Sequence, residues 1–220
     1  MFPNVDWEVM MLETWNTLYM TFVAGAATFV FGLGLGMLLY ITNEPLMTKN
    51  RFIYSIVGAF VNIFRSVPFI ILIILLIPFT RTIVGTILGP TAALPALIIG
   101  AAPFYARMVE LALREVDRGV IEAAESMGAT KWQIIYKVLF PEALPAIVSG
   151  ITVTIVALVG YTAMAGVIGS GGLGTLAFLD GFQRSQNDVT FVATVLILVI
   201  VFIIQFIGDR LVTKIDKRSA

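Results

Sequence analysis

Residues 189–208 read VTFVATVLILVIVFIIQFIG, a run of 20 residues without a charged side chain. An α-helix rises about 1.5 Å per residue, so about 20 apolar residues suffice to cross the hydrocarbon core of a bilayer. This stretch therefore predicts a membrane-spanning helix, and it sets the class of the whole chain.

The composition of the 220-residue chain agrees with that class. Hydrophobic residues make up 59% and charged residues 13%, against about 45–50% and about 25% in soluble domains. The 14 basic and 14 acidic residues balance, which argues against a nucleic-acid partner. There is no Cys and no His, so disulfides, thiolate metal sites and the commonest general base are excluded. We expect no catalytic, cofactor or metal site on this chain.

Four further apolar segments predict helices, which gives an all-α membrane protein with five transmembrane spans. The second is interrupted by Arg65 and Pro68, and the third contains Arg107 and gives way to a polar stretch after Val109. The fourth opens with Pro145, which suits the first turn of a helix. The five spans cover about residues 14–41, 52–78, 95–113, 145–168 and 189–208.

The basic residues predict the orientation of these spans. Eleven of the 14 lie in the first loop, in the segment from Arg107 to Lys137 around the third loop, and in the C-terminal tail. The positive-inside rule then places the N-terminus outside and the C-terminus in the cytoplasm, as an odd number of spans requires. A cleaved signal peptide is not expected, because no basic segment precedes a short apolar core. The eleven are Lys49, Arg51, Arg107, Arg114, Arg118, Lys131, Lys137, Arg210, Lys214, Lys217 and Arg218.

The third loop, residues 117–141, is the longest polar segment and is predicted to be cytoplasmic. Residues 120–127 favour a helix, and Gly128 stands where a helix ends with a left-handed residue. Thr130 and Gln133 form a capping-box pattern that starts a second helix, which Pro141 is expected to stop. On this chemistry alone, a solvated connector and a partner-binding segment are equally good interpretations.

The same loop resembles a known motif. Glu122-Ala123-Ala124 is followed after three residues by Gly128, and after nine more by Val138-Leu-Phe-Pro141. This is similar to the EAA loop of binding-protein-dependent ABC importer permeases, whose pattern ends in I-x-L-P. Val138 replaces the Ile and Phe140 the Leu, both mild departures.

Further segments resemble the methionine-importer branch of that family, and the similarity covers about residues 14–212 of a single domain formed by residues 1–220. The sequence contains no G-x-x-x-x-G-K-[ST] phosphate loop, so if transport is driven by ATP, the ATPase must be a separate chain. The similar segments are residues 65–69, 77–81, 133–145, 159–166, 169–174 and 204–209.

The resemblance implies the partners of this chain. It implies a homodimeric permease in a bacterial cytoplasmic (inner) membrane, bound to two copies of an ATPase that carries ATP and Mg²⁺. A methionine-binding lipoprotein would dock outside, and L-methionine, with D-methionine as a further substrate, would be carried inward. By position, Glu122, Ala123, Ala124 and Gly128 would form the ATPase-coupling interface.

Two motifs are open to misreading. Residues 169–174 match G-x-G-x-x-G, but they follow a span rather than a strand, so a glycine-rich turn or re-entrant entry to an external loop is favoured over a dinucleotide site. That loop could meet the binding protein. Gly32 and Gly36 form G-x-x-x-G, for which close packing within the chain is favoured over a dimer contact.

Three residues are candidates for the transport path or its frame. Arg65 would either reach the interface from an interface-lying helix or pair inside the bundle and help to break the helix, and both structural roles are favoured over substrate binding. Tyr161 and Met164 lie among small residues near the outer end of span four, where a deformable side chain could narrow a path. Ordinary bundle packing is an equally good interpretation of this pair.

Two other functional classes compete with an importer subunit. A secondary transporter or channel would more often carry ionisable residues inside its spans, and only Arg65 and Arg107 stand in the apolar parts of these. An intramembrane enzyme would need Ser–Lys or paired Asp in place of His and Cys, and no Asp lies inside a span.

Overall fold

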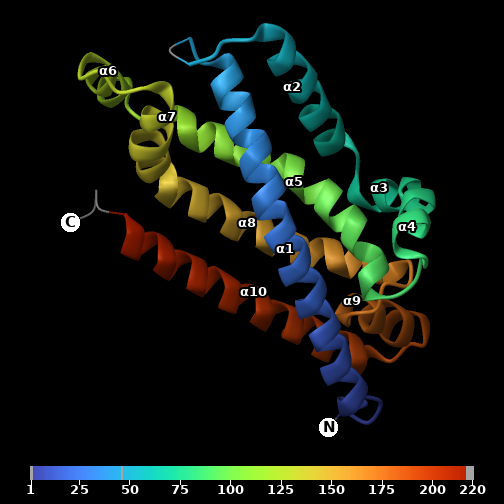
Figure 1. Cartoon of the computed structure of the whole chain (residues 1–220). Coiled ribbons are helices and arrows are strands. Elements are labelled where there is room, and N and C mark those ends of the chain that lie inside the picture. Colours follow the sequence, from blue (N-terminus) through green and yellow to red (C-terminus); the bar gives the residue numbers. More distant parts are fainter. Residues whose placement is uncertain (1, 46, 217–220) are drawn as a thin grey trace.

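The computed structural model describes residues 2–45 and 47–216, and within them every regular element is helical (Figure 1). The predicted all-α class is confirmed for this part of the chain. Lys217 and Arg218, two of the basic residues used to orient the tail, lie outside the described residues.

Four helical runs are long and apolar enough to cross a membrane. In Figure 1, α1 crosses α5 and α8, and α10 runs beside α8; α1 packs against both helices that it crosses. The main helices of these runs are α1 (Trp7–Asn43), α5 (Pro90–Arg114), α8 (Phe140–Val167) and α10 (Asn187–Ile215).

A fifth candidate span is bent. The predicted interruption of residues 52–78 is a turn of 107° between α2 (Arg51–Ser66) and α3 (Phe69–Leu75). Val67, the residue before Pro68, has the extended backbone that a following proline imposes, with φ −80° and ψ 124°. A further short helix, α4 (Ile77–Val84), returns the chain toward α5.

Arg65 lies in the last turn of α2 and forms no ion pair within the described residues. Its side chain is exposed, and no carboxylate in residues 2–45 or 47–216 lies within salt-bridge distance of it. The expectation that Arg65 pairs inside the bundle is therefore wrong for the described residues. The break in the helix is explained by Pro68, which cannot donate a backbone hydrogen bond.

The helices that correspond to the predicted first and third spans, α1 and α5, begin earlier than the sequence suggested. The α1 helix starts at Trp7 because the Asp6 side chain accepts hydrogen bonds from the amides of Glu8 and Val9, an N-cap that hydropathy does not register. The α5 helix starts at Pro90 and continues through two internal prolines.

Pro141 does not stop a helix, which corrects the sequence prediction. The chain runs without a break from α7 (Lys131–Ile134) through a π-helical turn, η1 (Ile135–Leu139), into α8. The wide turn precedes Pro141, which then occupies the first turn of α8, where its missing N–H and its ring are tolerated. Pro145 lies inside α8 rather than at its start.

The G-x-x-x-G pair forms a close contact between α1 and α5. A Cβ on Gly32 would lie 2.9 Å from the carbonyl oxygen of Ala102, and one on Gly36 would lie 2.5 Å from that of Ala106. Both glycines are buried. The predicted close packing of this motif within the chain is confirmed, because only a hydrogen atom fits at either position.

Replacement of Gly36 with Val is therefore expected to destabilise the chain by about 1–3 kcal/mol, the usual cost of overpacking a core. Gly34 is the matched control, because nothing lies within 4 Å of a Cβ placed there. Gly34→Ala should leave stability unchanged or raise it by up to about 1 kcal/mol through helix propensity. The measurement is the midpoint of thermal unfolding in detergent, and equal midpoints for the two variants would contradict the packing argument.

Candidate functional site

The predicted cytoplasmic segment folds as two short helices with a sharp corner. The α6 helix (Arg118–Ser126) starts at Asp117, whose side chain accepts a hydrogen bond from the Gly119 amide at 2.6 Å. It ends before Gly128, which has φ +81°. The Ala129 amide then donates to the Ala124 carbonyl at 3.1 Å, which closes the helix end. The left-handed Gly128 is confirmed.

The second helix starts with the predicted capping box. The Thr130 hydroxyl accepts from the Gln133 amide at 3.4 Å, and the Gln133 side chain accepts from the Thr130 amide at 2.8 Å. Two further contacts fix the segment to the loop after α1. The Lys131 Nζ donates to the Met47 carbonyl at 2.6 Å, and Arg118 lies 3.8 Å from Glu44.

The four residues of the EAA pattern do not share one face. Glu122, Ala123 and Gly128 are exposed, whereas Ala124 is buried with Ile121 in the chain's own hydrophobic core. Ala124 therefore holds α6 against the membrane domain, and the exposed face is left for a partner.

Sequence reasoning missed three large apolar side chains on this segment. Met127, Trp132 and Tyr136 are 82%, 77% and 75% exposed. Trp132 and Tyr136 are four residues apart on one helical run, a spacing that places them on the same face. That spacing next to the EAA pattern was the available signal. Exposed apolar side chains at this density are typical of a protein-binding surface.

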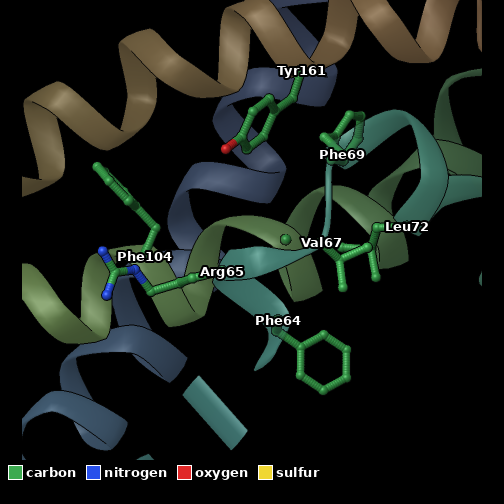
Figure 2. A pocket seen from close by; sticks show the side chains of 8 residues that line it. Phe64, Arg65, Val67, Phe69, Leu72, Phe104 and Tyr161 are labelled. Carbon is green, nitrogen blue, oxygen red and sulfur yellow. The ribbon is translucent and has the colours of Figure 1, made fainter. Parts of the chain in front are cut away.

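A cavity of about 240 Å³ lies where the bent α2–α3 pair meets α5 and α8. Figure 2 shows Tyr161 facing Phe69 across one side of it and the Arg65 guanidinium beside Phe104 on another. The rings of Tyr161 and Phe69 stack, with centroids 4.5 Å apart and planes within 4°. The lining residues are Phe64, Arg65, Val67, Phe69, Leu72, Gly100, Phe104 and Tyr161.

Tyr161 and Met164 occupy different environments. Tyr161 is half-buried and lines the cavity, whereas Met164 is 48% exposed and is not among the lining residues. The structure thus brings Tyr161, but not Met164, to a cavity. Both stand in the last two turns of α8.

The glycine-rich segment is packed inward. Gly172, Leu173 and Gly174 are buried, and they lead into α9 (Leu173–Thr175) and a π-helical run, η2 (Leu176–Gln183). The favoured glycine-rich turn is confirmed, since Gly169, Gly171 and Gly172 all have positive φ. Its contact with a binding protein stays a prediction.

A buried ionic cluster on α5 was also missed. Glu110 is fully buried and lies 2.5 Å from Arg107 and from Arg114, whose side chains are 33% and 37% exposed. Tyr54 of α2 donates to Glu110 at 3.5 Å and accepts from Arg114 at 3.3 Å. The spacings i, i+3 and i, i+4 are visible in the sequence, but they fall where the predicted third span gives way to a polar stretch. No group of three or more acidic residues in residues 2–45 and 47–216 could hold a metal ion.

Comparison with known proteins places this arrangement. Residues 29–220 match the family model described as binding-protein-dependent transport system inner membrane component. The chain is 61% identical over 217 residues to the methionine import system permease protein MetP of Bacillus subtilis (strain 168), covering 99% of this chain and 98% of that one. It is 50% identical over 204 residues to the D-methionine transport system permease protein MetI of Escherichia coli (strain K12), covering 93% and 94%.

The fold of this chain also matches that of a solved structure. The fold superposes with a TM-score of 0.93 on a chain from inward-facing conformations of the MetNI methionine ABC transporter, in its native crystal form. The identity there is 49%, and 96% of this chain and 98% of that chain are covered.

The α5 cluster yields a stability prediction. Glu110→Gln removes the only carboxylate that pairs with Arg107 and Arg114 within the described residues, so we expect a loss of about 2 kcal/mol. This is below the about 3–5 kcal/mol of a fully buried pair because both guanidinium groups reach solvent. Glu115→Gln, an exposed position just beyond the end of the same helix, should change stability little. Indistinguishable unfolding midpoints in detergent would contradict the prediction.

Proposed function

The chain belongs to the family of binding-protein-dependent transport system inner membrane components, and on that premise we infer that it is the permease subunit of a methionine ABC importer. The observation that carries this is 61% identity over almost the whole length of a methionine import permease, together with the fold of the MetNI transporter. The reaction is vectorial transport across the inner membrane, and this chain makes no covalent bond.

We propose that the membrane domain has five spans, with the bent α2–α3 pair counted as the second. The basic residues of the described chain support an external N-terminus and a cytoplasmic C-terminus. The loop before α2, the α6–η1 segment and the end of α10 are basic, whereas the N-terminal tail carries only acidic charges. In this orientation Tyr161 and Met164 stand near the outer side.

The proposed assembly contains a second copy of this chain, two ATPase subunits that bind ATP and Mg²⁺, and an external methionine-binding lipoprotein. The exposed face of α6, with Glu122, Ala123 and Gly128, is proposed to dock on the ATPase. Met127 and Trp132 extend that face with apolar surface. The inward-facing Ala124 anchors α6, so that a push on the exposed face is passed to the membrane domain.

The transmission route runs through the backbone. We call residues 117–141 the coupling segment. Since α7, η1 and α8 form one continuous helical run, a displacement of this segment moves the proposed cytoplasmic end of α8 directly. The contact between Lys131 and Met47 and that between Arg118 and Glu44 carry part of the same displacement to α1. Two states of one rigid unit, biased by nucleotide on the partner, are what alternating access requires.

The proposed path passes the cavity beside Tyr161. Apart from Arg65 and Gly100, its lining is aromatic and aliphatic, which suits a thioether side chain. A secondary-transport mechanism is disfavoured, because Glu110, the fully buried carboxylate among the described residues, is paired with two guanidinium groups and so has a structural role. The intramembrane-enzyme alternative receives no support from the cavity, whose lining carries no nucleophile–base pair.

The test of this function is uptake of radiolabelled methionine by the chain reconstituted with its ATPase and binding protein. Uptake should require ATP and the loaded binding protein, and unlabelled L-methionine should compete. Uptake that survives ATP depletion but collapses with the ion gradient would favour a secondary transporter instead.

Replacement of Glu122 with Lys, or of Gly128 with Val, is expected to uncouple ATP hydrolysis from uptake. Charge reversal alters the proposed docking face, and a β-branched residue cannot easily adopt φ +81°. Methionine transported per ATP hydrolysed should fall about tenfold, because ATP hydrolysis would continue without the push on the membrane domain.

The matched controls are Gly128→Asn, which tolerates the left-handed conformation, and Glu115→Lys, an exposed position outside α6. Both should keep near-normal coupling at an equal amount of protein in the membrane. Normal coupling in Glu122→Lys and Gly128→Val alike would remove the assigned role of this segment.

A further inference from the structure

The cavity where α2 and α3 meet α5 and α8 is lined by two polar side chains that the fold itself does not use. Of the lining residues, only Arg65 and Tyr161 carry a side-chain nitrogen or oxygen. Within residues 2–45 and 47–216, no ion pair or hydrogen bond involves the Arg65 guanidinium, and no hydrogen bond involves the Tyr161 hydroxyl. Both groups are therefore available to a solute in the cavity.

The position of Arg65 along its helix makes an unpaired cation costly. Because α2 starts at Arg51, beside the basic first loop, Arg65 lies about 21 Å along the helix axis from that end. In the proposed five-span arrangement this is well inside the hydrocarbon core, which is about 30 Å thick. Charged side chains at such a depth face protein or a water-filled cavity, and they mark substrate paths. A ligand explains an unpaired arginine at this place better than the packing of α2 does.

The two sides of the cavity differ in chemistry. Figure 2 shows the Arg65 guanidinium on one side, beside Phe104. On the other side the rings of Tyr161 and Phe69 stack, with centroids 4.5 Å apart. Aromatic rings make favourable contacts with a thioether sulfur, whereas a guanidinium binds a carboxylate through two parallel N–H donors. The cavity thus offers one place for an anion and another for an apolar chain that contains sulfur.

We propose that Arg65 binds the carboxylate of the transported methionine, whose side chain lies against Tyr161 and Phe69. The cavity volume of about 240 Å³ is below the about 300–1,000 Å³ of sites for drug-sized ligands, so it suits one small solute. This inference rests on the proposed function. It gives Arg65 the substrate-binding role that the sequence patterns ranked below two structural roles, of which pairing inside the bundle is absent among the described residues.

The test is the binding of radiolabelled L-methionine to the complex of the permease and its ATPase in lipid nanodiscs. Nucleotide and binding protein are left out, so that the permease alone selects the ligand. L-Methioninamide, in which a neutral amide replaces the carboxylate, is the competitor that isolates the negative charge. In the parent complex, unlabelled methionine should compete about tenfold better than methioninamide, because hydrogen bonds between charged groups are stronger than neutral ones.

Variants of Arg65 separate charge recognition from simple destabilisation. Arg65→Gln should weaken methionine binding about tenfold and bring the affinities for methionine and methioninamide within about twofold of each other. Arg65→Lys keeps the charge but loses the two parallel donors, so its affinity for methionine should fall between those of Arg65→Gln and the parent. The unfolding midpoint of Arg65→Gln in detergent should equal that of the parent, because no polar contact with the described residues is lost.

Arg81→Gln is the matched control. Arg81 is also an exposed arginine without an ion pair among the described residues, but it lies on α4 and does not line the cavity. This variant should bind methionine and methioninamide as the parent does.

Equal methionine binding by Arg65→Gln and the parent would overturn the inference. So would a parent complex that binds no methionine saturably, or one for which methioninamide competes as well as methionine. If the unfolding midpoint of Arg65→Gln falls, the comparison of the two ligands on the parent complex still decides. All these outcomes leave the proposed function intact, because that function is judged separately, by ATP-dependent methionine uptake through the unmodified chain.

Discussion

A peptide group in hydrocarbon must find its hydrogen-bond partner inside the protein, and this requirement governs the structure. It is why every regular element of the described residues is a helix, and why some of the prolines stand at helix starts or beside irregular turns. Pro68 stands at the bend between α2 and α3, and Pro141 follows the π-helical turn of η1. The glycine-rich segment obeys the same rule, because Glu13 and Thr17 pair with amides that its own backbone leaves free.

The helices are joined by contacts of different kinds. The α1–α5 contact at Gly32 and Gly36 brings two backbones together with no side chain between them. The segment from α6 to η1 contacts the loop after α1 through two polar links, and its Ala124 lies in the hydrophobic core. Its second helix continues without a break into α8, and the C-terminal end of α8 meets the glycine-rich segment. A single helical run therefore links the EAA segment to the glycine-rich segment.

Local patterns in the sequence predicted much of this. The charge-free run at residues 189–208 lies within α10, the capping box at Thr130 and the left-handed Gly128 are present, and the G-x-x-x-G motif packs as expected. Each of these depends on interactions within a few residues or on a periodicity that one helix reveals. The expected stop at Pro141 was wrong because a local signal cannot show that the preceding turn has widened to accept the ring.

Contacts between distant segments were beyond such patterns. Nothing in residues near Glu13 indicates that it meets Gly172, and the burial of Glu110 depends on Tyr54 and on helices that pack around α5. The orientation of α6 likewise depends on contacts with distant segments and could not be predicted from local patterns. The EAA motif identified the segment, but only the fold shows that Ala124 faces inward and that Met127, Trp132 and Tyr136 face solvent.

The distribution of charge along the chain now has a physical explanation. A buried carboxylate is costly unless it is paired, and Glu110 is paired twice over. That arrangement leaves a net positive charge on the partly exposed Arg107 and Arg114, at the end of α5 where the positive-inside rule expects basic residues. The ionic contacts of α5, with the link from Tyr54, therefore fix helices to one another, and their cost is offset because each buried charge has a partner.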